Sequence, residues 1–277
     1  EEQITKAQPK GNVPALRFPE FTEGWATKSI SDLATVTGGG TPDTAVKSYW
    51  NGDIQWFTPS EIGKNKYVDL SLRTITEEGL NNSSAKLLPP YTILLSSRAT
   101  VGECSIALQE CATNQGFQSL IAKNCDIDFL YYLIQTKKKE LMKKACGSTF
   151  LEISANEIRK IHTYVPSINE QKKIGVLLSL IDKCIDTQNK IIEDLKKLKS
   201  ALADKLYSST KGETYSFRQL FDVVNERNKK LTYSNVLSAS QELGMIERSD
   251  INIDIKFEQD SISKYKIVRR GDYVVHL

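Results

Sequence analysis

Three consecutive glycines, Gly38 to Gly40, come closer to a known chemical motif than any other residues in this chain. Glycine runs cradle phosphates when a lysine and a helix follow them, because the backbone N–H groups then point at the anion. Thr41 and Pro42 follow here instead, so the run is neither a P-loop nor a dinucleotide-binding motif. Short hydroxyl side chains are frequent in the next residues, and we interpret the segment as a loop that brings backbone N–H groups close to a phosphate.

Catalytic and metal-binding patterns are not found in the sequence. The chain has only two histidines, His162 and His276, so a Ser–His or Cys–His relay has few possible bases. Its five cysteines form no C-x-x-C pair, and no metal site is predicted. It also lacks a G-x-S-x-G elbow and the N-P-P-[YF] tetrapeptide of methyltransferases. We therefore expect a non-catalytic protein without cofactor or metal, which binds or assembles other molecules.

The overall charge narrows the choice of partners only slightly. The 277 residues carry 37 basic and 34 acidic side chains, a net charge of +3. This balance argues against an acidic mimic of DNA, and any DNA-binding face has to arise from local clustering. An odd number of unpaired cysteines is typical of reduced thiols, no apolar run approaches the length of a membrane span, and the acidic first residues do not form a signal peptide. We expect a soluble cytoplasmic protein with no membrane partner.

The loop described above needs a scaffold, and residues 25–166 supply a mixed pattern of short helices and strands. Residues 92–97 and 117–122 are apolar and bounded by turn signals, as buried strands are. The spacing of Ile30, Leu33 and Val36 fits one face of a short helix, and residues 126–146 fit a single longer helix. We predict a mixed α/β domain.

The second half of the 126–146 segment is strongly basic. Five lysines accompany a single glutamate there: Lys137, Lys138, Lys139, Lys143 and Lys144. Solvation of an exposed helix face is the ordinary explanation of such a run, and a surface that faces phosphates is the alternative.

The strongest pattern in the chain begins after Pro166. Ser167 and Glu170 have the spacing of a capping box, and a heptad-like seam follows to residue 206 with two polar positions. The seam consists of Ile174, Leu178, Ile181, Ile185, Gln188, Ile192, Leu195, Lys199, Leu202 and Leu206. A helix of this length extends roughly 60 Å, so its apolar seam requires a partner helix.

A partial repeat follows a linker at 208–213. Residues 30–36 and 217–223 share the spacing apolar-x-x-Leu-x-x-Val, and 91–96 and 271–276 both place a short apolar strand after a turn. The order of the two matches along the chain is the same, so we interpret residues 209–277 as a linker and part of a second domain related to the first.

Several segments together resemble the DNA-specificity (S) subunit of type I restriction-modification systems. They are residues 17–25, 38–62, 87–102, 112–121 and 147–182, with 237–250 and 263–275 resembling the start of that family's second target-recognition domain. The resemblance implies two recognition domains that each read half of a bipartite DNA site, and helices that hold two methyltransferase subunits, joined by restriction subunits. It also implies that cofactor, methyl transfer and cleavage belong to those partners, and that the present chain is truncated within its second recognition domain.

We therefore expect an N-terminal arm (1–24), a first recognition domain (25–166), a long coiled-coil helix (167–208) and a partial second recognition domain (209–277). The expected DNA-binding residues are Gly39, Gly40, Thr41, Lys47, Gln55, Thr58, Ser60, Lys64, Ser97, Arg98, Asn114, Gln115, Ser148 and Thr149. The expected coiled-coil or partner interface consists of Ile174, Leu178, Ile181, Ile185, Gln188, Ile192, Leu195, Leu202 and Leu206.

Three alternatives stay open, two about the roles of residues and one about the function of the chain. The aromatic side chains near the glycine run, Tyr49, Trp50, Trp56 and Phe57, fit a small satellite core better than a base-stacking surface. Arg98, which follows a buried strand, belongs either to the DNA-facing surface or to a structural ion pair. The whole chain is either a double-stranded-DNA recognition subunit or a coiled-coil scaffold that dimerises through the long helix without DNA specificity of its own.

Overall fold

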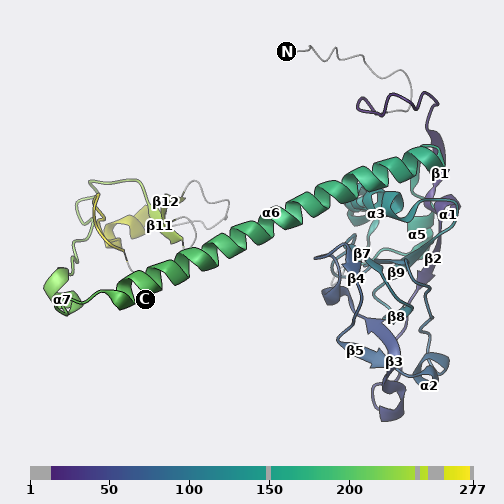
Figure 1. The fold of residues 1–277 in the computed structure, drawn as a ribbon, viewed down its shortest axis with the longest axis horizontal. Helices are drawn as coiled ribbons and strands as arrows, with labels where there is room; N and C mark the ends of the chain where they lie inside the picture. The colour runs from purple at the N-terminus through teal and green to yellow at the C-terminus, as the bar shows by residue number, and fades with distance from the viewer. Residues whose placement is uncertain (1–13, 148–150, 241–243, 249–258, 275–277) are drawn as a thin grey trace. The chain divides into compact units, whose positions relative to one another are not determined.

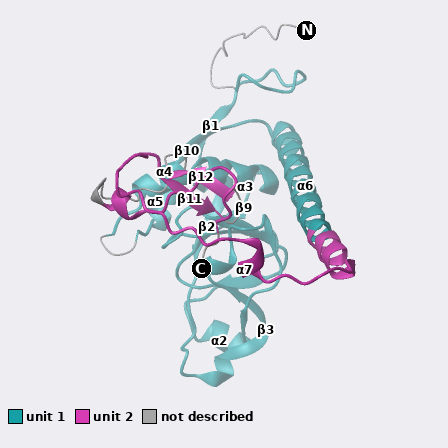
Figure 2. Cartoon of the chain, turned by 90° about the vertical axis from the view of Figure 1, so that its left-hand side faces the viewer, with its two compact units in different colours: residues 1–199 teal, residues 200–277 magenta. Residues whose placement is uncertain are grey.

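The computed structural model describes residues 14–147, 151–240, 244–248 and 259–274. The chain forms two compact units, residues 1–199 and 200–277 (Figure 2). The long helix α6 (Ile168–Ser209) crosses the boundary between them (Figure 1). None of the helices in the described ranges has the length and apolar character needed to cross a membrane. The predicted mixed α/β class followed by a long helix is confirmed.

Unit 1 is built on a five-stranded sheet with the order β2-β9-β6-β7-β4. Neighbouring strands are antiparallel except for β4 and β7, which are parallel. The strands are β2 (Ala34–Gly38), β9 (Gln118–Ala122), β6 (Ile93–Leu95), β7 (Cys104–Ala107) and β4 (Tyr67–Val68). The two strands predicted at 92–97 and 117–122 correspond to β6 and β9. Both lie inside the sheet, which explains their continuous apolar character.

Two smaller sheets complete unit 1. In the three-stranded sheet, β3 pairs with β5 in antiparallel and with β8 in parallel orientation, and β1 pairs with β10 in a separate antiparallel ladder. These strands are β3 (Trp50–Phe57), β5 (Arg73–Ile75), β8 (Cys111–Thr113), β1 (Ala26–Ser29) and β10 (His162–Val165). The sequence patterns did not predict this second sheet, because β5 and β8 have only three residues each and β8 pairs with β3 across a long interval of the chain.

Short helices cover the main core at the end of unit 1 nearest the start of α6, while the three-stranded sheet lies toward the opposite end (Figure 1). The helices of the main core are α1 (Ile30–Leu33), α3 (Ile127–Thr136), α4 (Lys138–Lys144) and α5 (Ala155–Arg159). The remaining helical turns of unit 1 are η1 (Lys47–Tyr49), η2 (Pro59–Glu61) and α2 (Glu77–Asn81).

Two predicted helices are shorter than the sequence pattern indicated. The single helix expected at 126–146 is interrupted at Lys137, which ends α3 and precedes α4. The helix face expected to include Val36 ends at Leu33, and Val36 is a buried residue of β2. Buried apolar residues occur in both elements, so periodicity alone did not reveal the change from helix to strand.

The first turns of α6 are attached to the segment that precedes β1. The Arg17 side chain donates two hydrogen bonds to Glu170, at 2.7 and 2.6 Å, and the Trp25 indole donates a third at 3.3 Å. Glu170 is almost fully buried, so these donors compensate a desolvated carboxylate. The Glu170 carboxylate predicted to take part in a capping box with Ser167 thus accepts from Arg17 and Trp25, and the capping box itself stays a prediction.

The described part of unit 2 that follows α6 contains short elements only. Beyond the end of α6 it has the helix α7 (Phe217–Leu220), the hairpin strands β11 (Leu237–Ser240) and β12 (Gly244–Glu247), and η4 (Gln259–Lys264). The four-residue helix α7 starts with a capping box between Ser216 and Gln219, and α1 starts with one between Ser29 and Asp32. The first pair of repeated segments therefore begins with the same capped helical turn in both copies, whereas the strand β6 in the second pair has no counterpart at 271–274, and residues 275–276 lie outside the described residues.

Candidate nucleic-acid interface

The glycine run is tightly packed against its own chain. Gly40 N donates a 2.8 Å hydrogen bond to Thr113 O, and the Trp56 indole donates to Gly40 O at 3.0 Å. A Cβ atom added at Gly39 would lie 2.2 Å from Asn114 O. Close approach between backbone segments therefore explains at least these glycines, independently of any phosphate.

Four of the predicted DNA-binding segments meet around residues 113–117. Thr41 Oγ1 donates to Gln115 Oε1 at 2.5 Å, which joins the glycine run to this loop. Asn114 N donates to Phe57 O at 3.1 Å, next to Thr58. Gly116 O accepts from Ser97 N at 2.8 Å. We call these four segments the loop cluster: residues 39–41, 58–60, 97–98 and 114–115.

The polar groups of the loop cluster differ in how far they are already engaged. Thr58 forms a capping box with Glu61, to which its hydroxyl donates at 2.6 Å. Asn114 Oδ1 accepts from Gly116 N at 2.9 Å and thereby shapes the turn. Thr58 and Asn114 thus stabilise the loops. Ser60 and Gln115 are exposed but also form hydrogen bonds within the loop cluster, Ser60 with Thr58 at 3.0 Å and Gln115 with Thr41.

Ser97 and Arg98 lie next to each other but in different environments. Ser97 is fully buried, and none of the described residues hydrogen-bonds to its hydroxyl. Arg98 donates two hydrogen bonds to Glu152, at 3.2 and 2.8 Å, and both side chains remain about two-fifths exposed, at 41% and 42%. The structural ion pair considered for Arg98 is present, and its role toward DNA stays a prediction.

The segment that carries Ser148 and Thr149 falls outside the described residues. On either side of it, Cys146 and Glu152 exchange two backbone hydrogen bonds of 2.9 Å. Ile153 N donates to Ser97 O, also at 2.9 Å. The chain therefore leaves and re-enters the described structure beside the loop cluster.

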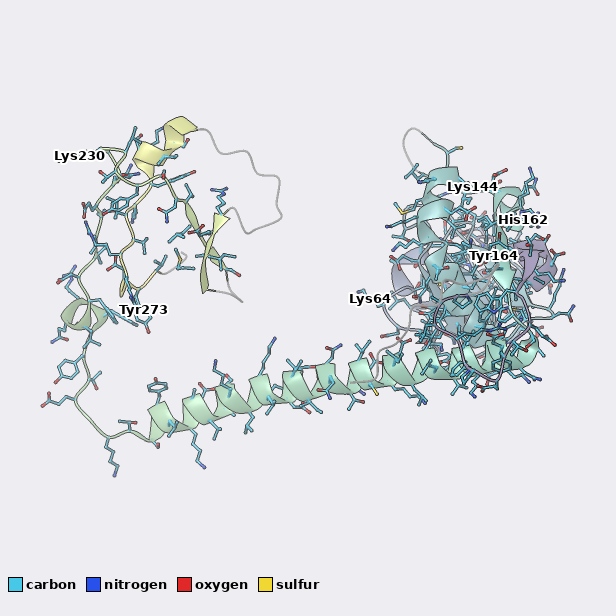
Figure 3. The ribbon with its side chains drawn as sticks, turned by 90° about the horizontal axis from the view of Figure 1, so that it is seen from above. Lys64, Lys144, His162, Tyr164, Lys230 and Tyr273 are labelled. Atoms are coloured by element: carbon cyan, nitrogen blue, oxygen red, sulfur yellow. The ribbon has the colours of Figure 1, made fainter. Side chains whose placement is uncertain are left out.

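Lys47, Gln55 and Lys64 are not joined to the loop cluster by any hydrogen bond or ion pair in the described structure. Lys47 and Lys64 are exposed and have no acidic partner among those residues, and Lys64 lies at the surface of unit 1 (Figure 3). The Gln55 amide oxygen accepts from Ser71 N at 2.7 Å and from Ser71 Oγ at 2.9 Å. Because this oxygen is already engaged, a contact from Gln55 to adenine would have to use its NH₂ group or break these bonds.

Acidic neighbours partly neutralise the basic run on α4. Lys137 pairs with Glu140 at 3.5 Å, Lys138 with Glu103 at 2.5 Å and Lys144 with Glu157 at 3.6 Å. Two exposed lysines of the run, Lys139 and Lys143, have no ion-pair partner within the described ranges. A phosphate-facing role is therefore easiest to assign to these two.

Three of the four aromatic side chains near the glycine run form the satellite core expected for them, with one addition, whereas Phe57 is buried in a different cluster with Leu88 and Phe117. Trp50 and Trp56 are buried with Ile75 and Ala112, and their rings meet edge to face at 5.2 Å. The Arg73 guanidinium lies 3.6 Å from the centre of the Trp50 ring. The sequence analysis did not identify Arg73, because only the pairing of β3 with β5 brings it to the tryptophans.

No thiol chemistry is indicated at this surface. All five cysteines are free, and burial raises the pKa of Cys104, Cys111 and Cys125 to about 12, so these thiols stay protonated and unreactive. Among the described residues, no group of three or more His, Cys, Asp or Glu side chains could hold a metal ion.

Known proteins resemble this chain in sequence and in fold. The specificity subunit of the type I restriction enzyme MjaIX from Methanocaldococcus jannaschii is 40% identical over 184 residues, which is 65% of this chain and 43% of that protein. The EcoR124I/EcoR124II specificity subunit from Escherichia coli is 30% identical over 216 residues, covering 73% and 52%. The chain thus spans about half the length of these curated relatives.

Two solved structures share the fold. One of them is described as the structural basis of complex assembly and conformational transition of the type I R-M system. It has a TM-score of 0.52 at 22% identity, and the match covers 67% of this chain and 46% of that chain. The HsdS subunit from Thermoanaerobacter tengcongensis has a TM-score of 0.50 at 20% identity, covering 67% and 45%. Residues 22–197 match the model of the type I restriction modification DNA specificity domain, and the chain belongs to that family.

Proposed function

We propose that this chain is a sequence-specific DNA-recognition subunit that directs methyltransferase and restriction subunits of a type I complex to their target. The observation that carries the proposal is the loop cluster, in which four polar segments from distant parts of the sequence meet beside exposed Ser60 and Gln115. Loops held by a rigid scaffold are typical positions for recognition residues. In this proposal the chain is not an enzyme, and cofactor, methyl transfer and cleavage belong to its partners.

The division into an arm (1–24), a first recognition domain (25–166), a coiled-coil helix (167–208) and a partial second recognition domain (209–277) is part of this proposal. The matching capped helices α1 and α7 support a relationship between the first recognition domain and the partial second one. In this division the contact between Arg17 and Glu170 attaches the arm to the helix.

Titration of duplex DNA at several salt concentrations tests the proposal. We expect replacement of Lys139 and Lys143 by Ala to weaken binding equally for all sequences. The slope of log K against log salt should become less steep by about 1.8, at about 0.9 per lost phosphate contact. Alanine at Lys137 and Lys144, which have acidic partners, is the matched control and should change the slope less. Equal slopes for all three proteins would remove the phosphate role of α4.

Arg98 and Glu152 allow a second test within the loop cluster. We expect Arg98→Ala to reduce DNA affinity without unfolding the domain, while Glu152→Ala frees the guanidinium and preserves or increases affinity. If the ion pair is only structural, both variants lower the unfolding midpoint alike and the folded protein binds DNA normally. That outcome would contradict the assignment of Arg98.

The partner surface in this proposal is the apolar face of α6. Its seam residues from Ile181 onward are about half exposed, for example 47% at Ile181, 53% at Ile185 and 49% at Ile192. A pair of helices covers such a stripe, and the second helix comes from the methyltransferase subunits or from a second copy of this chain. Two copies related by a two-fold axis would read a palindromic site with a spacer.

Sedimentation distinguishes between these two partners of α6. We expect the wild-type chain to be a dimer and the Ile181→Asp/Ile185→Asp/Ile192→Asp variant to be a monomer. If both proteins are monomers, the dimer is refuted, and the methyltransferase subunits are the expected partner of the α6 seam. A dimer that shows no salt-dependent DNA binding would instead favour the scaffold function.

A further inference from the structure

A lysine outside the loop cluster connects the globular part of unit 1 to the long helix. Lys66, in the loop before β4, has a side chain that is only 11% exposed. Its ammonium nitrogen lies 2.6 Å from Asp128 Oδ1 on α3 and 2.6 Å from Ser179 Oγ on α6, and it donates to the Tyr132 hydroxyl at 3.2 Å. One cation from the loop before β4 therefore binds groups on two helices, α3 and α6.

Tyrosine side chains surround the same ammonium group. It lies 4.5 Å from the centre of the Tyr132 ring, 5.2 Å from that of Tyr67 and 5.5 Å from that of Tyr131. Tyr67 donates to Asp128 at 2.9 Å, and Tyr132 donates to Asp182 on α6 at 2.5 Å. Burial and the neighbouring Asp128 raise the pKa of Tyr67 to about 12, so its hydroxyl stays a donor at neutral pH. We call Lys66, Asp128, Tyr132, Ser179 and Asp182 the lysine clasp.

Among the described residues, the clasp is the last set of hydrogen bonds between α6 and the rest of unit 1 along the helix. Nearer its start, Gln171 accepts from Asp126 N at 3.0 Å and donates to Pro166 O at 2.9 Å. At Gly175 an added Cβ would lie 3.0 Å from Asp126 Oδ1, so α3 and α6 approach closely there. After Asp182, every residue of α6 within unit 1 is exposed (Figure 3).

The close approach at Gly175 and the clasp at Ser179 and Asp182 constrain the helix differently. A contact through a small residue fixes distance but permits pivoting, because it has little directional character. The hydrogen bonds that Ser179 and Asp182 accept, about a turn or two further along α6, oppose such a pivot, since hydrogen bonds weaken steeply when distance and angle change. The direction of α6 then depends on the clasp more than on the apolar contact at Ile174.

We propose that Lys66 is a positioning residue that holds α6 in one direction relative to the globular part of unit 1. This direction determines where the exposed portion of α6 lies with respect to the loop cluster. The mechanical part of the proposal does not depend on DNA. Its consequence, that the clasp fixes the placement of recognition loops relative to partners on the helix, rests on the proposed function.

Distance measurements between two spin labels test the proposal on the full chain without DNA. Native Cys146 is exposed and held by its two backbone hydrogen bonds to Glu152, and it carries one label. The second is attached to Lys196→Cys in a Cys184→Ser background. The three remaining cysteines are buried and do not react. Position 196 lies about 21 Å along the axis from Asp182, so a swing of about 10° displaces the label by about 4 Å.

We expect one narrow distance distribution for the wild-type clasp and for Lys86→Met, an exposed lysine that serves as the matched control. Lys66→Met should broaden the distribution or add a second maximum while the helical circular dichroism is retained. Tyr132→Phe keeps the ring but removes the hydroxyl between Lys66 and Asp182. This variant should broaden the distance distribution to a smaller extent than Lys66→Met.

A role in stability alone gives a different result. In that case both variants lower the unfolding midpoint, but the folded protein keeps the wild-type distance distribution, and the proposal is overturned. If Lys66→Met does not fold, Tyr132→Phe decides by the same criterion. Because no DNA is present, failure of the proposed DNA recognition would leave these distances unchanged, and the two proposals are tested separately.

Discussion

Alanine substitutions in the glycine run provide a sharp test of how this loop is built. A Cβ at Gly39 would lie 2.2 Å from Asn114 O and 2.4 Å from Thr113 O, and at Gly40 it would lie 2.4 Å from Ala85 N. These neighbours are backbone atoms, which cannot rotate away. At Gly38 the nearest atom is 3.6 Å away and belongs to the Gln118 side chain. The three adjacent glycines therefore have very different tolerance for a methyl group.

The expected magnitudes follow from these contacts. Overpacking typically costs about 1–3 kcal/mol. In Gly40→Ala, displacement of the loop also weakens the hydrogen bonds that join Gly40 to Thr113 and to Trp56, each of which contributes about 1 kcal/mol. We expect Gly40→Ala to lower the free energy of unfolding by roughly 3–5 kcal/mol and Gly39→Ala to lower it by roughly 1–3 kcal/mol. Gly38→Ala should change it by less than about 1 kcal/mol, because reduced chain entropy in the unfolded state favours alanine.

Urea unfolding followed by tryptophan fluorescence is the appropriate assay. Trp56 donates to Gly40 O and touches Trp50, so its emission reports on this region. If Gly39→Ala were as stable as Gly38→Ala, the close approach to residues 113–114 would be wrong. The glycines would then have to be explained by contact with a ligand.

Other substitutions have equally direct expectations. Ala99 has a φ of 63°, so Ala99→Gly should raise the free energy of unfolding by roughly 1 kcal/mol in urea titrations, and a decrease would contradict the backbone geometry. Arg17→Met leaves the buried Glu170 carboxylate without its cation and should lower the free energy of unfolding by about 3–5 kcal/mol. Adding Glu170→Gln to the same chain should restore part of this loss. Equal stability of the wild type and Arg17→Met would refute the contact. In a thiol assay near neutral pH only Cys146 and Cys184 should react before unfolding. The buried thiols have pKa values raised from 9.0 to about 12, so their contribution to stability is complete below about pH 9 and is lost as the pH rises toward 12. The midpoint of urea unfolding should therefore fall over this pH range.

Patterns with a short range along the chain predicted much of the fold. The strands β6 and β9, the satellite core around Trp50 and Trp56 and the long helix all follow from runs or periodicities of apolar residues. The break at Lys137 did not, because the apolar residues on both sides continue a single helical period. Periodicity reports burial, and it does not report whether the backbone hydrogen bonds are continuous.

Contacts between distant residues explain most of what the sequence did not reveal about the site. The lysines of α4 look like a uniform basic run, but Glu103 and Glu157 neutralise two of them from other elements. Arg73 reaches Trp50 only through strand pairing, and Lys66 reaches Ser179 across more than a hundred residues. Charge in a linear sequence therefore overestimates the charge that remains available to a ligand.

The seam of α6 shows how one sequence pattern serves two different contacts. Ile174, its first member, packs against the main core of unit 1, whereas Leu195, Leu202 and Leu206 are 58%, 51% and 67% exposed. Complete burial of a leucine or isoleucine contributes at least about 1.5 kcal/mol, so covering the exposed halves of six such positions would contribute roughly 5 kcal/mol. This is comparable with the whole free energy of unfolding of a small domain, about 5–15 kcal/mol. Since long helices obtain most of their stability from packing of an apolar face, the portion of α6 beyond the lysine clasp should depend on association with a partner helix, while the portion before it is stabilised by unit 1.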